Sequence, residues 1–418
     1  MRARADRFDI TPTVTLDQGS GNTASDVDVT RPPAETLEAN ILALWPDDDD
    51  SGPVLLVTLD LLYPGAAVRE AVERGAEGLA PERIVVAASH THRAPMTDAE
   101  KPLLGRADDD YLAWLTKTLT RRVRDVLDVE HAPLATLSAG SAVAAHSVNR
   151  RRRVRLLLGF PPRRNVMARL PDRDGPVDET VIVGSVDDVE GHPIARFWNY
   201  ACHPVAHPDP QVYSSHYPHT VRERMRAKAQ EPAMPVLYFQ GFSGDTRPTA
   251  SIGVRDWRAL IHRVVSGPQF RHVMRPSAYR AWSASLADRA MRALHGAAPI
   301  AVDAIRTRRI TRPLSEFADG PGPDVTFQSV RFSDDLLLVG MSGEPVVEYA
   351  TVVRAMGDAR LTMCAGCVDD VFGYVPTARM IVEGGYESEG FCASFGLRSI
   401  SPDVEKNTRA ALVSLLSP

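Results

Sequence analysis

Two histidines, His90 and His92, follow directly on a run of small and branched apolar residues, Ile84 to Ala88. Such a run is typical of a strand that is buried on both faces. Successive strand residues point to opposite faces, so His90 and His92 are predicted to point to the same side. Paired imidazoles at a strand end can bind a metal or act as acid and base. The alternative is one structural histidine beside one surface histidine.

A second apolar strand runs into a histidine just before a proline, in the segment Ile194-Ala-Arg-Phe-Trp-Asn-Tyr-Ala-Cys-His203-Pro204. Proline ends a strand because it lacks the N–H that the sheet needs. Taken together with His90, the position of His203 favours a metal ligand. Two other nearby histidines, His192 and His207, are interpreted as surface residues.

Two glycine-containing loops can lie close to a ligand because glycine has no side chain in the way. Gly19 and Gly21 stand in the first of them. The second follows the apolar strand Val236–Gln240 and carries Ser243, Asp245 and Arg247. A Gly-x-x-Gly turn offers backbone N–H groups to an oxyanion. Taken alone, it is better interpreted as an ordinary turn in which an aspartate accepts backbone hydrogen bonds.

Further polar residues follow a third apolar strand, Leu336 to Met341. Glu344 stands after this strand and before a predicted helix, where it can interact with the helix N-terminus or bind a metal. Tyr374 and Tyr386 follow later. Tyrosine is an uncommon zinc ligand, so both are core or pocket-wall candidates from the residue type alone. Cys364 and Cys367 form a single C-x-x-C pair, which we interpret as buried reduced thiols.

The elements that must position these residues follow from hydrophobic periodicity. Helices are predicted over 66–79, 111–127, 218–229, 277–295, 346–356 and 403–416, and strands over 41–45, 53–60, 84–88, 135–143, 153–158, 180–186, 193–200, 236–240 and 336–341. Residues 53–92 form a β-α-β unit, which indicates an α/β protein. We predict a layered α-β-β-α sandwich of mixed sheets flanked by helices, in a single domain over 1–418. Residues 249–276 are predicted to be an insertion that can cover a pocket as a lid.

The chain has 418 residues and a net charge of −5 with both signs interspersed, which gives no reason to expect nucleic acid as a partner. No apolar stretch approaches the ~20 residues of a membrane span, so no integral membrane association is expected. The N-terminal segment lacks the hydrophobic region of a secretory signal. Four cysteines in a chain of this length do not make a disulfide framework. These features lead us to expect a cytoplasmic enzyme, and they leave the oligomeric state open.

In combination and in this order, several of these segments resemble the catalytic domain of the neutral ceramidases, zinc-dependent amidases that cleave the fatty acyl amide of ceramide. The matching segments are Phe8-Asp-Ile-Thr-Pro12, Ser89-His-Thr-His92, Val148-Asn-Arg150, Asn199-Tyr-Ala-Cys-His203-Pro204, Gly244-Asp-x-x-Pro248, Gly343-Glu344, Gly373-Tyr374-Val-x-Thr377 and Tyr386-Glu387. The likeness extends from the start of the chain to about residue 390. No single segment is specific, but the combination is.

The resemblance implies a set of functional residues. One zinc ion per chain is expected, with the ligands His90, His203, Glu344 and Tyr374. His92 would lie beside the metal and act on the transition state, with Asp245 as a further catalytic residue in the Gly-Asp loop. Arg150 and Tyr386 would bind the carbonyl or carboxyl oxygen of the substrate. Independently of the resemblance, the places of Gly19, Gly21, Ser243 and Arg247 in the two glycine-containing loops lead us to expect them to bind substrate as well. The family's fold of stacked α and β layers agrees with the predicted architecture.

Two departures from the family bear on the reaction. The ceramidases carry a serine, regarded as the nucleophile, where this chain has Arg247, and neither Ser243 nor Thr246 takes that position. We also expect no separate C-terminal β domain of the kind that lipid-facing ceramidases carry, which favours a smaller substrate than a membrane ceramide. We therefore expect a zinc hydrolase that cleaves the amide bond of a small N-acyl substrate with zinc-bound water, whose pKa the metal lowers to ~7.

Three alternatives remain open at this point. The same metal site can serve an ester or lactone hydrolase. It can also serve an acyl-transfer or cyclisation enzyme of a biosynthetic pathway, since a polarised carbonyl reacts with an amine as well as with water. The third alternative is a ligand-binding homologue without catalysis.

Overall fold

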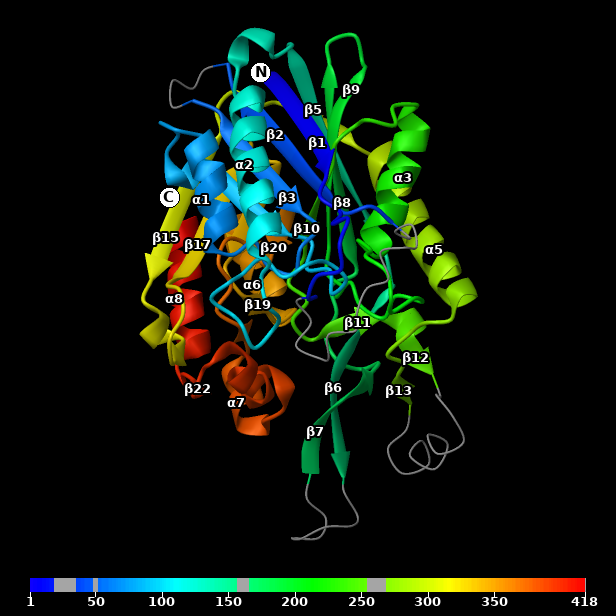
Figure 1. Cartoon of the computed structure of the whole chain (residues 1–418), viewed down its shortest axis with the longest axis vertical. Helices are drawn as coiled ribbons and strands as arrows, with labels where there is room; N and C mark the ends of the chain where they lie inside the picture. The colour runs from blue at the N-terminus through cyan, green and yellow to red at the C-terminus, as the bar shows by residue number, and fades with distance from the viewer. Residues whose placement is uncertain (19–34, 48–51, 156–164, 254–267, 418) are drawn as a thin grey trace.

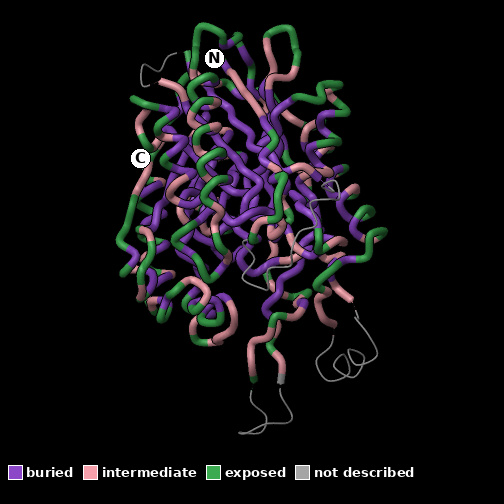
Figure 2. Tube along the Cα trace, in the orientation of Figure 1, coloured by how far each residue is buried: buried purple, intermediate pink, exposed green. Residues whose placement is uncertain are grey.

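The computed structural model of the chain describes residues 1–18, 35–47, 52–155, 165–253 and 268–417. Its centre is built from strands, with helices packed on both outer sides (Figure 1). The central strands are almost entirely buried, whereas the outer helices alternate buried and exposed turns (Figure 2). Helices α1 and α2 cover one side of the strands, and helices α3 and α5 cover the opposite side (Figure 1).

The first large sheet has the strand order β1-β2-β3-β4, in which β3 and β4 are parallel and the other pairs are antiparallel. Its strands are β1 (Arg2–Asp9), β2 (Glu38–Trp45), β3 (Val54–Leu59) and β4 (Ile84–Ala88). Facing it is a sheet of order β10-β9-β8-β5-β14, with β9 and β10 parallel. Its strands are β5 (Ala135–Val143), β8 (Thr180–Asp188), β9 (Pro193–Tyr200), β10 (Val236–Gln240) and β14 (Ala298–Ile300).

A third mixed sheet of order β15-β17-β18-β20 continues the first one. Its strands are β15 (Arg306–Arg312), β17 (Val325–Arg331), β18 (Leu336–Met341) and β20 (Leu361–Ala365). The two sheets are joined where β4 meets the segment after β20, because Ala88 N–H donates to the Cys367 carbonyl and Asp369 N–H donates to the Val86 carbonyl. The remaining strands are β6 (Ser147–Arg155), β7 (Asn165–Asp172), β11 (Thr246–Pro248), β12 (Ile252–Gly253), β13 (Gln269–Phe270), β16 (Ala318–Asp319), β19 (Glu344–Pro345), β21 (Tyr374–Val375) and β22 (Ser399–Ile400).

The helices are amphipathic and cover the outer faces of these sheets. Their bounds are α1 (Ala66–Gly75), α2 (Asp109–Val126), α3 (Tyr217–Ala229), α5 (Pro276–His295), α6 (Glu348–Gly357), α7 (Ala378–Glu383) and α8 (Val404–Leu416). Helices α6 and α8 pack on the sheet that contains β17 and β18. No helix in the described ranges combines the length and the apolar composition needed to cross a bilayer.

Strands β2, β3 and β4 are buried on both faces, as their continuous apolar sequence predicts. In β3, Leu55 and Val57 pack toward α1 and α2, whereas Val54 and Leu56 pack toward the facing sheet. The same alternation places Val86 on the helix side and Val85 on the sheet side of β4. The inner layer is therefore a sheet-on-sheet core, which is the α-β-β-α arrangement that the sequence predicts.

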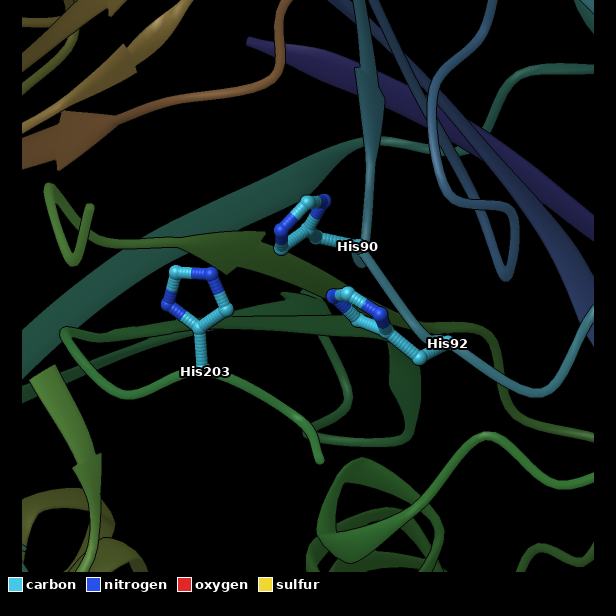
Figure 3. A group of neighbouring side chains, drawn as sticks. All are labelled: His90, His92 and His203. Carbon is cyan, nitrogen blue, oxygen red and sulfur yellow. The ribbon is translucent and has the colours of Figure 1, made fainter. Parts of the chain in front are cut away.

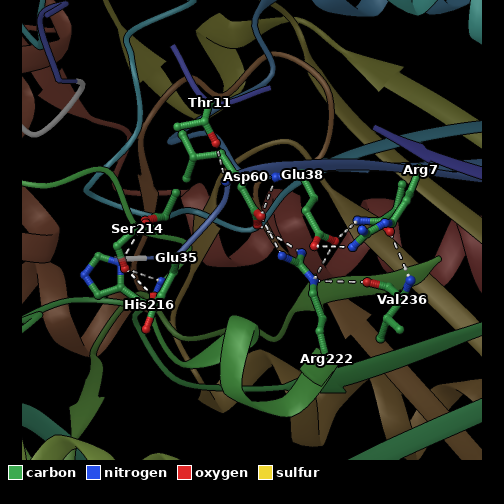
Figure 4. A network of polar contacts seen from close by, with 12 residues as sticks. Arg7, Thr11, Glu35, Glu38, Asp60, Ser214, His216, Arg222 and Val236 are labelled. Atoms are coloured by element: carbon green, nitrogen blue, oxygen red, sulfur yellow. Dashed lines mark hydrogen bonds and ion pairs between the residues drawn. The ribbon is translucent and has the colours of Figure 1, made fainter. Parts of the chain in front are cut away.

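A buried network of ion pairs ties helix α3 to the first sheet (Figure 4). Arg222 on α3 forms two hydrogen bonds with the Asp60 carboxylate, at 2.5 and 3.0 Å. Arg226, one helical turn later, forms two with Glu38 of β2, at 2.7 Å each. Because buried charges are costly unless paired, these contacts fix the position of α3 relative to β2 and β3. Helix α3 follows the loop after β9, so the network also fixes the end of that loop.

The layered α/β class that the sequence predicts is confirmed, and several elements differ in detail. Helix α1 ends at Gly75 rather than 79, followed by Gly78 with a φ of +88°. The strand predicted over 153–158 instead runs over Ser147–Arg155 and pairs with β7. The alternation argument for His90 and His92 is wrong, because β4 ends at Ala88 and His90 has a φ of +62°. Of the predicted insertion, residues 254–267 lie outside the described residues, and the single-domain organisation stays a prediction.

Candidate metal and substrate site

The candidate site lies where the carboxyl ends of β4, β9, β10 and β18 gather. Chain segments after parallel strands meet at one edge of a sheet, which is where α/β proteins place their ligands. Strands β3 and β4 are parallel neighbours, as are β9 and β10 and also β18 and β20. His90 follows β4, His203 follows β9, and Glu344 follows β18. This topology explains how residues more than a hundred positions apart come together.

His90 and His203 are both buried, and a backbone carbonyl fixes the tautomer of each. His90 Nδ1 lies 3.1 Å from the Leu62 carbonyl oxygen, and His203 Nδ1 lies 2.7 Å from the Ser243 carbonyl oxygen. A carbonyl oxygen can only accept, so both Nδ1 atoms carry the proton. Each Nε2 therefore faces the site, where it can donate to Glu344 when protonated and bind a metal when neutral. Metal-binding histidines are commonly oriented by such a contact.

Glu344 supplies the carboxylate between the two imidazoles. Its Oε2 lies 3.2 Å from His90 Nε2 and 3.1 Å from His203 Nε2. Its Oε1 accepts a hydrogen bond of 2.5 Å from the hydroxyl of Tyr63, which lies beyond the end of β3. Burial raises the pKa of Glu344, but the two imidazoles outweigh it and hold the pKa well below 4.5. The carboxylate is therefore ionised.

Tyr374 is brought to the site by strand pairing. Glu344 and Tyr374 are register partners in the parallel pair β19 and β21, and Glu344 N–H donates to the Gly373 carbonyl. The Tyr374 hydroxyl lies 3.5 Å from His203 Nε2. Zinc–ligand bonds of 2.0–2.2 Å set neighbouring ligand atoms about 3.0–3.6 Å apart, which leaves room for a fifth ligand such as water. The contacts of 3.1, 3.2 and 3.5 Å match this spacing.

Three buried polar atoms here have no hydrogen-bond partner among the described residues: His90 Nε2, His92 Nε2 and Glu344 Oε2. Buried polar atoms in native structures are almost always satisfied, so these three indicate a missing ligand. The imidazoles of His90, His92 and His203 lie around one point (Figure 3), and one nitrogen from each lies within 4.8 Å of the others. The residues present can therefore hold a metal ion.

His92 lies beside the other two histidines, with its ring centroid 4.9 Å from that of His90 and 6.0 Å from that of His203. Burial, and then the neighbouring His90 and His203, lower the pKa of His92 well below 6.5. The neutral ring lines the cavity described below. The group Asp188, Glu190 and His192 can also hold a metal, but it lies at the exposed hairpin between β8 and β9.

Arg150 approaches the site from strand β6. Its guanidinium lies 5.5 Å from the ring centroid of Tyr374 and 5.6 Å from that of Tyr386, and the two rings are 5.5 Å apart. Arg150 Nε donates to Glu387 at 2.7 Å, while Nη2 is buried without a partner. Arg150 and Tyr386, both predicted to bind a substrate oxygen, thus lie next to Tyr374, a predicted metal ligand.

In the loop after β10, Ser243 and Asp245 support the site from behind, whereas Arg247 lines the larger cavity. Asp245 is fully buried, and its two carboxylate oxygens accept from Val347 N–H at 2.8 Å and Asn149 Nδ2 at 2.7 Å. Burial raises the pKa of Asp245 to about 6. The Ser243 hydroxyl accepts from Gln240 at 2.6 Å. The aspartate's contacts correspond to the ordinary-turn interpretation of the sequence. Gly19 and Gly21 lie outside the described residues.

Two cavities meet at the predicted ligands. The larger has a volume of about 550 Å³ and is lined by His92, Arg150, Arg169, Arg247, Phe270 and Tyr386, among others. The smaller has a volume of about 190 Å³ and adds the apolar residues Leu62, Leu104 and Phe395. His92, Tyr374, Tyr386 and Arg169 line both. A bound substrate can therefore extend to either side of the metal position.

Two residues in contact with the site were missed by sequence reasoning. Tyr63 binds Glu344 as described above, and its ring lies 5.3 Å from that of His90. Its position just after the buried strand β3 is the signal that could have identified it. Cys367 interacts with His90, and burial raises the pKa of the Cys367 thiol. All four cysteines are free and buried, which agrees with the interpretation of Cys364 and Cys367 as buried reduced thiols.

Comparisons with known proteins point to one fold. No protein-family model matches the sequence, and no curated protein matches it. The structure is similar to the crystal structure of neutral ceramidase from Pseudomonas aeruginosa, with a TM-score of 0.75 and 14% sequence identity over 99% of this chain and 74% of the other. A structure described as ceramidase complexed with C2 matches with the same values. The chain therefore has a neutral-ceramidase-like fold.

Proposed function

We propose that the chain is a zinc-dependent hydrolase that cleaves the amide bond of a small N-acyl substrate, with water as the nucleophile. The observation that carries this proposal is the convergence of imidazole, carboxylate and phenol groups on one buried point with unpartnered atoms. The donor set suits zinc, which takes nitrogen and oxygen ligands. His90, His203, Glu344 and Tyr374 would hold one ion per chain.

Bound in such a set, zinc supplies Lewis acidity to a water and to a carbonyl oxygen. The protein's own groups then perform the remaining tasks. His92 Nε2 is unpartnered at the cavity and would accept a proton from the attacking water and return it to the leaving nitrogen. Arg150 Nη2, with Tyr386 beside it, would hold the substrate's carbonyl or carboxyl oxygen.

Water rather than a side chain is supported as the nucleophile by the contents of the larger cavity. Its lining contains no serine or threonine among the described residues. The Ser243 and Thr246 hydroxyls are buried and bond to neighbouring protein groups. A quench experiment that traps an acyl group on Ser243 or Thr246 would count against this mechanism.

The test combines metal content with substrate profiling. Elemental analysis should find about one zinc per wild-type chain and a loss of that zinc in His90→Ala and Glu344→Gln. His295→Ala, at the exposed end of α5, serves as the matched control and should retain it. Profiling uses N-acyl amino acids, short ceramides and the corresponding esters. Full zinc content in His90→Ala would overturn the ligand assignment, and an ester-only profile would favour the esterase alternative.

A further inference from the structure

The larger cavity carries an excess of positive charge. Arg150, Arg169 and Arg247 all line it, and the described lining residues include no aspartate or glutamate. The three side chains come from β6, β7 and β11, which are neighbouring strands of one small sheet. Strand pairing therefore brings three guanidinium groups to one wall.

Arg247 is the least compensated of the three. No ion pair to it occurs among the described residues, and its buried Nε atom has no hydrogen-bond partner. Its guanidinium packs on the ring of Phe270, 4.8 Å from the centroid. Burial, and then the nearby charges of Arg150 and Arg169, lower the pKa of Arg247 to about 9. The side chain remains a cation at neutral pH in a site that disfavours one.

The other two arginines do not cancel this excess. Arg169 packs its guanidinium on Tyr386, 4.2 Å from the ring centroid, and no carboxylate partner of it occurs among the described residues. Arg150 is paired with Glu387 at 2.7 Å, but the same carboxylate also binds Arg151 at 2.7 Å. One carboxylate is therefore shared between two guanidinium groups.

Arg247 is half-buried and has no ion-pair partner among the described residues, and such a cation is costly unless a ligand supplies the opposite charge. The guanidinium fork matches the two oxygens of a carboxylate or phosphate. The smaller cavity, on the other side of His92 and Tyr374, has a volume of about 190 Å³, against about 550 Å³ for the larger one. Leu62, Leu104 and Phe395 line it, together with Arg169 and the Glu344 carboxylate. Of the two cavities, only the larger therefore has arginines in its described lining without a carboxylate to offset them.

We propose that the substrate is an anionic amide: the half in the larger cavity carries a carboxylate or phosphate bound by Arg247 and Arg169, and the other half is a short group that fits the smaller cavity. This inference rests on the proposed amide hydrolysis and specifies its substrate class. It excludes a neutral amide with two long chains, such as a membrane ceramide, as the preferred substrate.

The kinetic test compares amides that share one short acyl group. The panel is N-butanoylglycine, N-butanoylaspartate, the butanamide of phosphoethanolamine, and the neutral N-butanoylglycine methylamide. A succinyl amide of isobutylamine carries its carboxylate on the acyl half instead of the amine half, so it reports which half of the substrate is anionic. We expect kcat/KM for the best anionic amide to exceed that of the neutral one by about tenfold or more. Arg247→Met should reduce this ratio about tenfold, mainly through KM.

The matched control is Arg121→Met, which removes an exposed arginine from α2 and should leave the ratio unchanged. Equal cleavage of neutral and anionic amides by the wild-type protein would overturn the inference and leave the proposed hydrolysis intact. The inference would also be overturned if Arg247→Met lost its activity toward the neutral amide and toward the anionic amides to the same extent. Thermal melting confirms that both variants are folded.

A binding measurement separates the inference from the hydrolysis itself. Titration calorimetry of the zinc-loaded protein with glutarate and with inorganic phosphate should show binding that weakens about tenfold in Arg247→Met and remains in Arg121→Met. If the protein binds these anions through Arg247 but cleaves no amide, the anion site stands and the proposed reaction fails. Anion binding that is the same in Arg247→Met and wild type overturns the anion site.

Discussion

Tyr63→Phe removes the hydroxyl that binds Glu344, on a residue that lines the smaller cavity and is not one of the four proposed metal ligands. The hydroxyl donates to Glu344 Oε1 at 2.5 Å, and the ring packs beside His90. Both contacts lie within the protein core, where Tyr63 is 4% exposed. Phenylalanine keeps the ring and its packing. The substitution therefore isolates the hydrogen bond that orients the carboxylate.

Two estimates of the effect agree. A hydrogen bond to a charged group contributes ~1.5–3 kcal/mol, and removing it leaves a buried carboxylate oxygen unpaired. Substitution of a group that orients a metal ligand typically lowers metal affinity or activity ~10–100-fold, which corresponds to ~1.4–2.8 kcal/mol. We expect Tyr63→Phe to weaken zinc binding by about this factor.

Competition with a calibrated chelator measures the zinc affinity, and chemical denaturation of the metal-free protein measures folding. Tyr111→Phe is the matched control, because it removes a buried hydroxyl that donates to the Ile10 carbonyl at 2.6 Å, away from the site. The control should lose stability but keep its zinc affinity. A folded Tyr63→Phe protein whose zinc affinity is within twofold of wild type would refute the assigned role of Tyr63.

Three further predictions concern the scaffold. Arg222→Met leaves the Asp60 carboxylate buried without its main cation. The free energy of unfolding, measured by urea denaturation, should fall by ~3–5 kcal/mol. An unchanged denaturation midpoint would contradict the role of this ion pair in holding helix α3. Burial raises the pKa of Asp245 from 3.8 to about 6, so the folded chain binds this proton more tightly than the unfolded chain. Its contribution to stability therefore falls as pH rises between about 4 and 6, and Asp245→Asn should remove that part of the pH slope, as measured by denaturation across this range. Gly244→Ala would place a Cβ atom 2.5 Å from the backbone oxygen of Glu344. The substitution should therefore displace the Glu344 carboxylate and reduce the zinc content found by elemental analysis. Normal zinc content would argue against the close packing of Gly244 on Glu344.

His90, His203 and Glu344, which the sequence pattern itself indicated, share one feature: each lies just after a continuous apolar strand. Arg150, Tyr374 and Tyr386 were expected only from the resemblance to the ceramidases. Strand β9 was predicted with its observed bounds, and His203 follows it by three residues. The same pattern located Glu344 beyond β18. A continuous run of apolar residues is a local signal in the sequence, and it is enough to locate a strand that is buried on both faces. That Glu344 and Tyr374 are strand partners depends on a pairing thirty residues apart, which local patterns do not contain.

Other features were missed for identifiable reasons. Strand β15 has the sequence Arg-Thr-Arg-Arg-Ile-Thr-Arg, whose single large apolar residue gives no strand signal; it forms because β17 supplies the pairing. The backbone of His90 is left-handed, a conformation uncommon for residues with a side chain and frequent at functional sites. The excess charge of Arg169 and Arg247 is a property of three strands together, and neither residue is distinctive alone.

The central claim is that His90, His203, Glu344 and Tyr374 hold one divalent zinc ion. Anomalous diffraction from crystals of the zinc-loaded protein, recorded on both sides of the zinc absorption edge, tests it most directly. We expect one strong peak per chain, about 2.0–2.2 Å from His90 Nε2, His203 Nε2 and the oxygens of Glu344 and Tyr374. The claim would be contradicted if the zinc-loaded protein showed no peak among these four side chains. It would equally be contradicted if the only peak lay at Asp188 and His192.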